Sequence, residues 1–270
     1  MIPNVLSIAG SDPSGGAGIQ ADIKAISANG AFAMAALTAL TAQNTQGVSD
    51  IHFVPPAFVQ SQIEAIFADI RVDAVKIGMI ATAEVSDAIA RSLSGHVAIP
   101  VVLDPVMIAK GGASLLQEDA VAALRTLLLP LATVLTPNLP EAAQLLGVQA
   151  AVTRDEMVEQ GQALCALGPQ AVLMKGGHLD GETSPDCLVT AQDAIWFEAP
   201  RIRTANTHGT GCTLSSALAA QLAKGLAPAA AAAAAKSYVS NAVAQAGDLS
   251  VGRGHGPTHH FASFYTNSKG

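Results

Sequence analysis

Short apolar runs alternate with longer amphipathic segments along most of this chain. The runs that are short enough to be buried strands are Val5–Ala9, Ala74–Ile77, Val101–Leu103, Val134–Leu135 and Ala171–Met174. Helical spacing of apolar positions is found at Phe58–Ile70, Glu84–Leu93, Asp119–Leu128 and Asp155–Leu167. This alternation predicts a mostly parallel central sheet with helices on both faces, which is a three-layer α/β/α architecture.

Two further patterns refine this prediction. Cys187–Thr190 and Ile195–Glu198 flank a short polar turn, which predicts an antiparallel pair of strands near one edge of the sheet. Residues 227–235 are almost all alanine and begin Ala227-Pro228; alanine favours helix, and proline is tolerated in a first helical turn. Because no linker or internal repeat interrupts the pattern, we expect a single domain over residues 1–270.

Polar residues or glycines follow each predicted strand. They are Gly10-Ser11-Asp12, Gly78-Met79, Asp104-Pro105-Val106, Thr136-Pro137-Asn138 and Lys175-Gly176-Gly177-His178. In open parallel sheets, ligands bind outside the carboxyl ends of the strands. We therefore expect these groups to meet at one edge of the sheet and to form a binding site there.

The segment Asn206–Cys212 stands directly before a helical stripe made by Leu214, Leu218 and Leu222. Its glycines permit close approach to a ligand, and the amide groups of a helix start attract an anion such as a phosphoryl group. The same position lowers the pKa of a thiol, so Cys212 is expected to be partly thiolate near neutral pH. The alternative is a tight turn with a small buried cysteine.

Phosphoryl transfer needs a cradle, cations and a group that orients the attacking oxygen. Gly209, Thr210 and Gly211 can supply the cradle with their amides, and Lys175 a cation. The oxygen-bearing residues Asn138, Glu141 and Asp104 could hold a magnesium ion. The Asn138–Glu141 spacing is also that of a helix N-cap followed by an acid, and the two roles are compatible.

Composition and charge exclude several other classes of function. Aromatic residues make up only 4% and the net charge is −7, which disfavours a nucleic-acid-binding protein. The three cysteines have no metal-binding spacing, and no signal peptide or membrane span is found, so we expect a cytoplasmic protein that binds no membrane. The chain has no P-loop sequence, and the missing G-x-G-x-x-G fingerprint disfavours a dinucleotide-dependent oxidoreductase.

Several ordered motifs resemble the hydroxymethylpyrimidine/phosphomethylpyrimidine kinases of thiamine biosynthesis, which belong to the ribokinase-like superfamily. The motifs are Ala9–Asp22, Thr41–Thr45, Lys76–Met79, Asp104–Met107, Thr136–Ala142, Lys175–His178, the Cys212 segment and the tail Gly252–Phe261. The resemblance implies a ribokinase-like fold. It also implies transfer of phosphoryl groups from ATP, first to 4-amino-5-hydroxymethyl-2-methylpyrimidine and then to its monophosphate, which gives the diphosphate.

The resemblance assigns roles to individual residues as expectations. The pyrimidine pocket would consist of Gly10, Ala17, Asp22, Gln43, Met79 and Val106. The nucleotide and magnesium region would contain Asn138, Glu141, Lys175 and Thr207, with ATP and Mg²⁺ as cofactors. Cys212 would either accept the hydroxyl proton or only position the substrate, and a homodimer is expected.

Two alternative functions remain at this stage. A pyridoxal kinase of the type that carries a cysteine at this turn would share both the scaffold and the turn. A non-catalytic ligand-binding protein could use the same fold, although Lys175, Glu141 and Cys212 argue against it. Two smaller questions also stay open: His208 could contact a phosphate or shape the turn, and His255, His259 and His260 could bind a metal or cap the fold.

Overall fold

The computed structural model describes residues 1–107 and 118–265, and this part of the chain contains one sheet of nine strands in the order β3-β2-β1-β4-β5-β6-β7-β8-β9. The strands are β1 (Asn4–Ser11), β2 (Phe32–Asn44), β3 (Gly47–Phe53), β4 (Ala74–Ile77), β5 (Val101–Leu103), β6 (Val134–Leu135), β7 (Ala171–Lys175), β8 (Asp186–Val189) and β9 (Ala194–Phe197). The predicted parallel centre and the predicted antiparallel pair β8–β9 are both confirmed.

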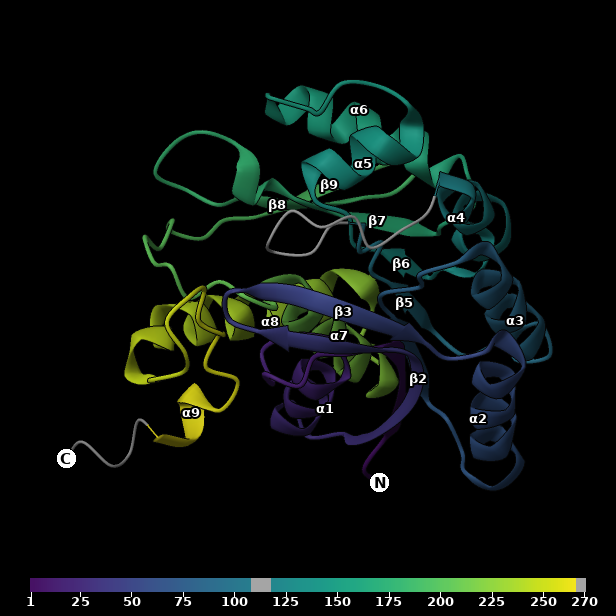
Figure 1. The fold of residues 1–270 in the computed structure, drawn as a ribbon. Coiled ribbons are helices and arrows are strands. Elements are labelled where there is room, and N and C mark those ends of the chain that lie inside the picture. Colours follow the sequence, from purple (N-terminus) through teal and green to yellow (C-terminus); the bar gives the residue numbers. More distant parts are fainter. Residues whose placement is uncertain (108–117, 266–270) are drawn as a thin grey trace.

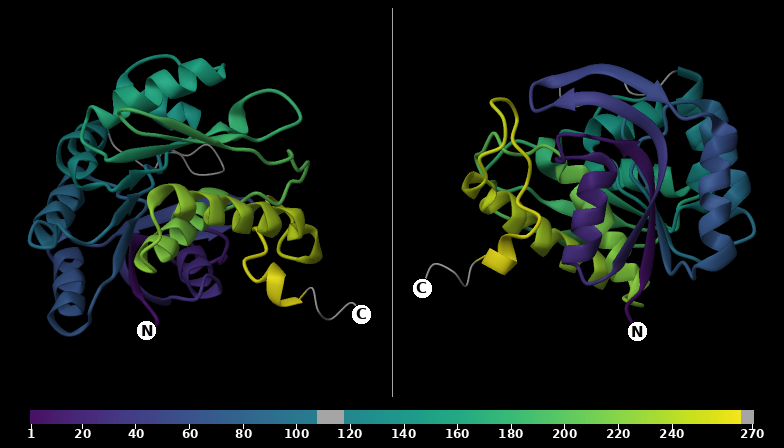
Figure 2. Two further views of the ribbon diagram at one scale, coloured as in Figure 1. Left: turned by 180° about the vertical axis from the view of Figure 1, so that it is seen from behind. Right: turned by 60° about the horizontal axis from the view of Figure 1, so that its bottom comes forward.

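Helices cover both faces of the sheet (Figures 1 and 2). They are α1 (Gly18–Ala28), α2 (Pro56–Asp69), α3 (Ala83–Leu93), α4 (Glu118–Ala123), α5 (Leu139–Leu146), α6 (Arg154–Cys165), α7 (Thr210–Ala223), α8 (Pro228–Ala244) and α9 (Ala262–Tyr265). Helices α2 to α6 pack on one face, and α1, α7 and α8 pack on the other. The three-layer α/β/α fold is therefore confirmed.

The central strand β1 shows why its sequence is apolar at nearly every position. Successive side chains of a strand point to opposite faces, so Leu6 and Ile8 enter the core beneath α2 and α3, whereas Val5 enters the core beneath α7 and α8. Both cores are closed to solvent. A strand between two helical layers has no polar face, which explains the continuous apolar run.

The hairpin of β2 and β3 was not predicted. β2 is rich in alanine and leucine, which favour helix in isolation, yet it pairs in parallel with β1 and in antiparallel with β3. The hairpin extends the sheet at the edge opposite β9 and carries the Thr41–Thr45 motif to the end of a strand (Figure 1). Its pairing with β1 decides its conformation, and no local pattern encodes that pairing.

The helices predicted for the alanine-rich segment and for Asp119–Leu128 are confirmed with small differences. The alanine-rich segment forms α8, with Pro228 in its first turn. The segment predicted as a helix over Asp119–Leu128 starts as α4 and continues as a π-helical turn at Leu124–Leu128. Among the described residues, none of the helices combines the length and the apolar character needed to span a bilayer.

Candidate active site

A pocket of about 460 Å³ opens at the carboxyl ends of the parallel strands, where the sequence predicts a binding site. We call it the strand-end pocket. Among the residues that line it are Gly10, Ala17, Gln43, Met79, Asp104, Val106, Asn138, Glu141, Lys175, Thr207, Gly209, Thr210, Gly211 and Cys212. The predicted site residues thus come together from seven separate segments of the chain, with Asp22 as the exception.

The turn before α7 is built as an anion cradle. Gly209 is the N-cap residue of α7 and has φ of 74°, in the left-handed region that glycine adopts without strain. A side chain at this position would collide with the carbonyl group of Gly16, so the two loops are in direct contact. The first residues of the fourteen-residue helix α7, Thr210, Gly211 and Cys212, line the pocket, and free amides at such a helix start can bind the oxygens of a phosphoryl group.

Lys175 lies beneath this cradle. Its ammonium group is 3.1 Å from Oδ1 of Asp104 and 3.6 Å from Oε2 of Glu141. A Cβ atom placed on Gly211 would be only 3.3 Å from Nζ of Lys175, so a side chain there would crowd the cation. Burial would lower the pKa of Lys175, but the charges of Asp104 and Glu141 raise that pKa above its ordinary value. Lys175 is therefore a permanent cation next to the predicted phosphoryl site.

The pKa values of the two carboxyl groups, Asp104 and Glu141, are shifted in opposite directions. Burial would raise the pKa of Asp104, but Lys175 and Lys76 hold it below its usual range. Burial raises the pKa of Glu141, and the charge of Lys175 opposes this rise only in part. Asp104 also accepts hydrogen bonds from Thr136 and Ser215, so it is the more firmly fixed anion of the pair.

Asn138 and Glu141 form a capping box at the start of α5. The Asn138 side chain accepts from the Glu141 amide at 2.8 Å, and the Glu141 carboxylate accepts from the Asn138 amide at 2.7 Å. Both residues also line the strand-end pocket. Asn138 and Glu141 therefore cap helix α5 and also line the pocket, so the two roles that the sequence left compatible can coexist.

The donor set near Lys175 fits a magnesium ion held jointly with phosphates. Mg²⁺ is usually bound by one or two carboxylates together with phosphate oxygens and water. Asp104 and Glu141 offer two carboxylates on the same wall of the pocket. In residues 1–107 and 118–265 no cluster of three or more His, Cys, Asp or Glu residues is placed to hold a metal without such help.

Asp22 differs from its expected place on the pyrimidine wall. It is fully buried behind the pocket and does not line it. Its carboxylate accepts hydrogen bonds from Ser7, Lys76 and Ser216, at 2.6 to 2.9 Å. These four contacts use the lone pairs that a pyrimidine would need, so Asp22 supports the pocket from behind here, and its direct contact with substrate stays a prediction.

Cys212 also differs from its expected state. Burial raises the pKa of the thiol to about 11, and the nearby ammonium of Lys76 lowers it only in part. The direction of this shift favours a neutral thiol over the partial thiolate expected from the helix start, and Cys212 lines the pocket.

The part of the pocket expected to hold the pyrimidine has an apolar and a polar component. Met79 packs directly against Gly10, since a Cβ atom at Gly10 would overlap its terminal methyl group. Val106 lines the same pocket, and Gln43 adds a polar amide to it. An apolar slot with a single amide suits a small flat heteroaromatic ring.

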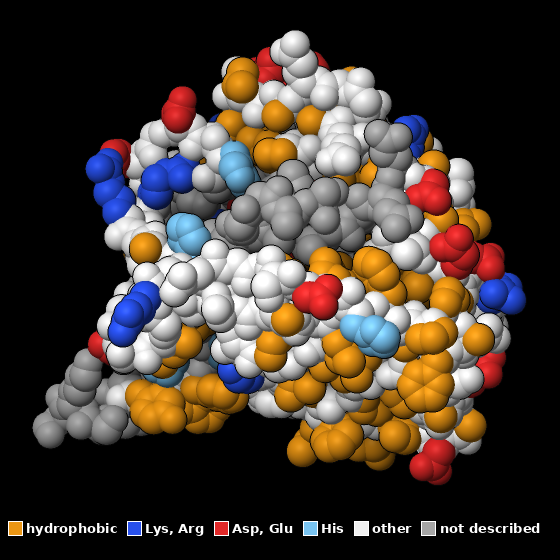
Figure 3. Space-filling view, viewed as in Figure 1, with side chains coloured by type: hydrophobic (Ala, Val, Ile, Leu, Met, Phe, Trp, Pro, Cys, Tyr) orange, Lys and Arg blue, Asp and Glu red, His pale blue; other side chains and the backbone are white. Residues whose placement is uncertain are grey.

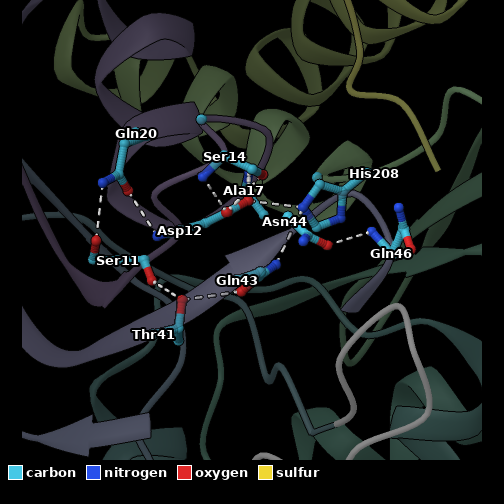
Figure 4. A network of polar contacts seen from close by, with 12 residues as sticks. Ser11, Asp12, Ser14, Ala17, Gln20, Thr41, Gln43, Asn44, Gln46 and His208 are labelled. Carbon is cyan, nitrogen blue, oxygen red and sulfur yellow. Dashed lines mark hydrogen bonds and ion pairs between the residues drawn. The ribbon is translucent and has the colours of Figure 1, made fainter. Parts of the chain in front are cut away.

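A polar network joins this side of the pocket to the anion cradle (Figure 4). Nε2 of His208 lies 2.8 Å from Oδ2 of Asp12 and 3.4 Å from Nε2 of Gln43. Asp12 further accepts from the amides of Ser14 and Ala17, which folds the loop before α1. Of the two roles left open for His208, the structure shows the shaping of the turn.

Among the residues that line the pocket, Asp12, Thr41 and Lys76 received no individual role from the sequence. Asp12 and Thr41 belong to motifs that the sequence singled out, but their partners lie 196 and 30 residues away along the chain. Lys76 sits inside an apolar strand and is completely buried. A lysine in such a strand is itself a signal, because a buried ammonium requires a buried carboxylate.

The histidine-rich tail caps the fold. His259 and His260 are buried, and Nε2 of His260 lies 3.0 Å from the hydroxyl of Thr213 on α7. Pro257 forms a bridge with His208 beside the cradle. Of the two roles left open for the tail, His259 and His260 show the capping role, whereas His255 is exposed, and among the described residues no cluster of three or more His, Cys, Asp or Glu residues is found.

The sequence and structure both have close relatives. The family described as phosphomethylpyrimidine kinase matches residues 12–259. The hydroxymethylpyrimidine/phosphomethylpyrimidine kinase of Escherichia coli K12 is 53% identical over 97% of this chain and 98% of its own length, and that of Rhizobium meliloti is 49% identical over 95% and 96%.

Solved structures give the same answer for the fold. The ADP complex of Bacillus subtilis pyridoxal kinase has a TM-score of 0.90 and 36% identity over 98% of this chain and 100% of its own. Phosphomethylpyrimidine kinase of Clostridium difficile has a TM-score of 0.79 and 42% identity over 89% and 99%. The fold is ribokinase-like, and this chain belongs to the phosphomethylpyrimidine kinase family.

Proposed function

We propose that this protein is an ATP-dependent kinase that phosphorylates 4-amino-5-hydroxymethyl-2-methylpyrimidine and then its monophosphate, as a step of thiamine biosynthesis. The observation that carries this proposal is the meeting of Lys175, the amides of the Gly209–Gly211 turn and Cys212 in one pocket. These are the cation, the cradle and the orienting group that phosphoryl transfer needs. Membership of the family supplies the substrate class.

The two ligands would bind at different ends of the pocket. We assign pyrimidine binding to Gly10, Ala17, Gln43, Met79 and Val106. We assign the phosphates of ATP to Asn138, Glu141, Lys175 and Thr207. Cys212 lines the same pocket as both sets, and we assign to its thiol the contact with the hydroxymethyl oxygen during transfer.

The positive charge of Lys175 would stabilise the negative charge that develops on the transferred group. Preorganised charges and amides are worth most in such a partly dehydrated site. A magnesium ion held by Asp104 and Glu141 would neutralise further phosphate charge. The amides of the cradle carry no formal charge and little bulk, so the same turn can receive either a hydroxymethyl group or its monophosphate ester.

Cys212 would act as a positioning group for the attacking oxygen. With a pKa of about 11, the fraction present as thiolate at pH 7 is on the order of one in ten thousand. Phosphoryl transfer passes through a loose transition state that requires little early proton removal. The proton can therefore leave late in the reaction, and a neutral thiol suffices to orient the hydroxyl group.

Pyridoxal phosphorylation is the second candidate function. It is favoured by the TM-score of 0.90 to Bacillus subtilis pyridoxal kinase, because the backbone that frames the pocket is closely similar. Steady-state turnover of hydroxymethylpyrimidine and of pyridoxal, each with ATP and magnesium, separates the two. We expect kcat/KM to be at least about 100-fold higher for the pyrimidine, and the reverse order would establish the pyridoxal kinase.

We further propose a homodimer located in the cytoplasm. Exposed hydrophobic side chains gather over α2 and the β2–β3 hairpin (Figure 3), and they include Leu40, Phe53 and Phe58. Surface apolar patches of this kind mark interfaces, and within the described residues β3 pairs only with β2. Light scattering should give twice the 27.2 kDa mass of the chain, and a monomer at micromolar concentration would contradict the dimer.

A further inference from the structure

The Gln43 side chain presents one amide atom to each of two partners (Figure 4). Its Oε1 lies 3.2 Å from Oγ1 of Thr41, and its Nε2 lies 3.4 Å from Nε2 of His208. A half-turn about the last side-chain bond exchanges the oxygen and the nitrogen with almost no change in shape. The chemistry of the two partners therefore decides which orientation is stable.

At one end, the hydroxyl group of Thr41 has its single hydrogen committed. Its Oγ1 lies 2.8 Å from the backbone carbonyl oxygen of Ser11, and a carbonyl oxygen can only accept. The hydroxyl can then offer Gln43 only a lone pair. This end of the amide is satisfied by the amide nitrogen, which donates, and not by the amide oxygen.

At the other end, Nε2 of His208 must carry a hydrogen. It lies 2.8 Å from Oδ2 of Asp12, and burial would raise the pKa of that carboxyl, but hydrogen bonds from His208 and Ser14 hold it below its usual value. An ionised carboxylate only accepts, so the imidazole donates to it. A ring nitrogen that carries a hydrogen has no lone pair left, so Nε2 cannot accept from the Gln43 amide nitrogen 3.4 Å away, whereas the Gln43 amide oxygen would be attracted to the partly positive N–H group.

We propose that Thr41 and His208 are positioning residues that hold the Gln43 amide with its nitrogen toward Thr41 and its oxygen toward His208. Both partners favour this same orientation of the amide, although they are independent of each other. A β-bulge between Ala42 and Gln43 contributes by redirecting the end of the strand.

The consequence for specificity rests on the function proposed above. The fixed amide keeps one N–H and one oxygen lone pair free for a ligand in the pocket. An aminopyrimidine edge offers the complement, a ring nitrogen that accepts beside an amino group that donates. The pyridoxal ring has no amino group beside its nitrogen, so a fixed amide discriminates against it.

Substitution of Thr41 tests this role. Thr41→Val keeps the shape but removes the lone pair, and Thr41→Ser keeps the hydroxyl as the matched control. For Thr41→Val we expect KM for hydroxymethylpyrimidine to rise about tenfold while kcat and KM for ATP stay within about twofold, with Thr41→Ser close to wild type. In Thr41→Val, the ratio of kcat/KM for hydroxymethylpyrimidine to kcat/KM for the analogue that lacks the amino group should also fall about fivefold. An unchanged KM, or an equal rise for ATP, would overturn the proposal.

A second measurement does not depend on turnover. Nitrogen-15 NMR of the ligand-free protein reports which nitrogens of His208 carry hydrogen, and a His208→Gln variant identifies the signal. We expect Nε2 to be protonated, and a bare Nε2 would overturn the orientation. If wild-type protein does not phosphorylate the pyrimidine, the proposed function fails while this NMR result still decides the amide. If turnover is normal and Nε2 is bare, only the inference fails.

Discussion

The ammonium group of Lys76 lies 2.9 and 2.8 Å from the two carboxylate oxygens of Asp22, and neither side chain is exposed to solvent. The pair forms a charged floor beneath the strand-end pocket, and its cation is one of the charges that act on Cys212. Asp22 also ties strand β1 to helix α7 through Ser7 and Ser216. The residue expected to touch the substrate thus supports the residues that line the pocket.

Removing the charge of Asp22 should destabilise the whole fold. Asp22→Asn leaves the Lys76 ammonium buried without its hydrogen-bonded counterion, so we expect the free energy of unfolding in urea to fall by about 3–5 kcal/mol. The matched control is Asp87→Asn, which breaks an exposed pair with Arg91 and should cost less than about 0.5 kcal/mol. An Asp22→Asn loss below about 1 kcal/mol would contradict a buried ion pair.

Alkylation should report the neutral state of Cys212. Because its pKa is raised to about 11, the rate of modification by iodoacetamide should climb about tenfold for each pH unit between pH 7 and pH 10, as the thiolate fraction grows. Peptide mass spectrometry separates Cys212 from the two other cysteines. A rate that levels off below pH 9 would show a thiolate and would restore a base role for Cys212.

The contact between the two loops predicts a selective effect at Gly209. Gly209→Ala would force the Cβ atom into the carbonyl group of Gly16, in addition to the strain of a positive φ. Gly225→Ala is the matched control, because Gly225 has φ of 86° but open space around it. We expect a loss of about 1 kcal/mol for the control, and a clearly larger loss together with at least a 100-fold drop in kcat for Gly209→Ala. Equal effects in both variants would contradict the close contact.

His260 should make stability depend on pH below neutrality. Burial, helped by the nearby charges of Lys24 and His259, lowers its pKa to about 4. The unfolded chain then binds this proton near pH 6.5 and the folded chain only near pH 4, so stability is full above pH 6.5 and declines as pH falls toward 4. The decline attributable to His260 is at most about 3 kcal/mol.

Urea titrations at several pH values measure this effect. His260→Gln should weaken the loss of stability between pH 6.5 and pH 4, even if its stability at pH 7.5 is lower than that of wild type. Parallel curves for the two proteins over this range would show that His260 does not titrate as its buried position requires.

The layers of the fold and the place of the site could be predicted from the sequence. Strands such as Val101–Leu103 are covered by helices on both faces, so their sequences are continuous apolar runs. Because these strands are parallel, the residues that follow them lie at the same edge of the sheet. The β2–β3 hairpin could not be predicted, because its conformation depends on pairing with β1 and its composition favours helix. Tertiary pairing overrides local preference there.

Individual roles within the site depended on burial, which a sequence does not display. A carboxylate one helical turn into α1 could face either the pocket or the core, and only the packing places Asp22 against Lys76. The same applies to Cys212, where the helix start and desolvation act in opposite directions and desolvation prevails. The amide of Gln43 likewise depends on Ser11 and Asp12, whose contacts arise only in the folded chain.

The most direct test of the proposed kinase is the product formed from the monophosphate. Purified protein is supplied with ATP, magnesium and 4-amino-5-hydroxymethyl-2-methylpyrimidine monophosphate, and the products are identified by mass spectrometry. A parallel reaction uses pyridoxal in place of the pyrimidine ester. We predict the pyrimidine diphosphate, formed with release of ADP. Formation of pyridoxal phosphate, with no diphosphate from the pyrimidine ester, would contradict the proposed function.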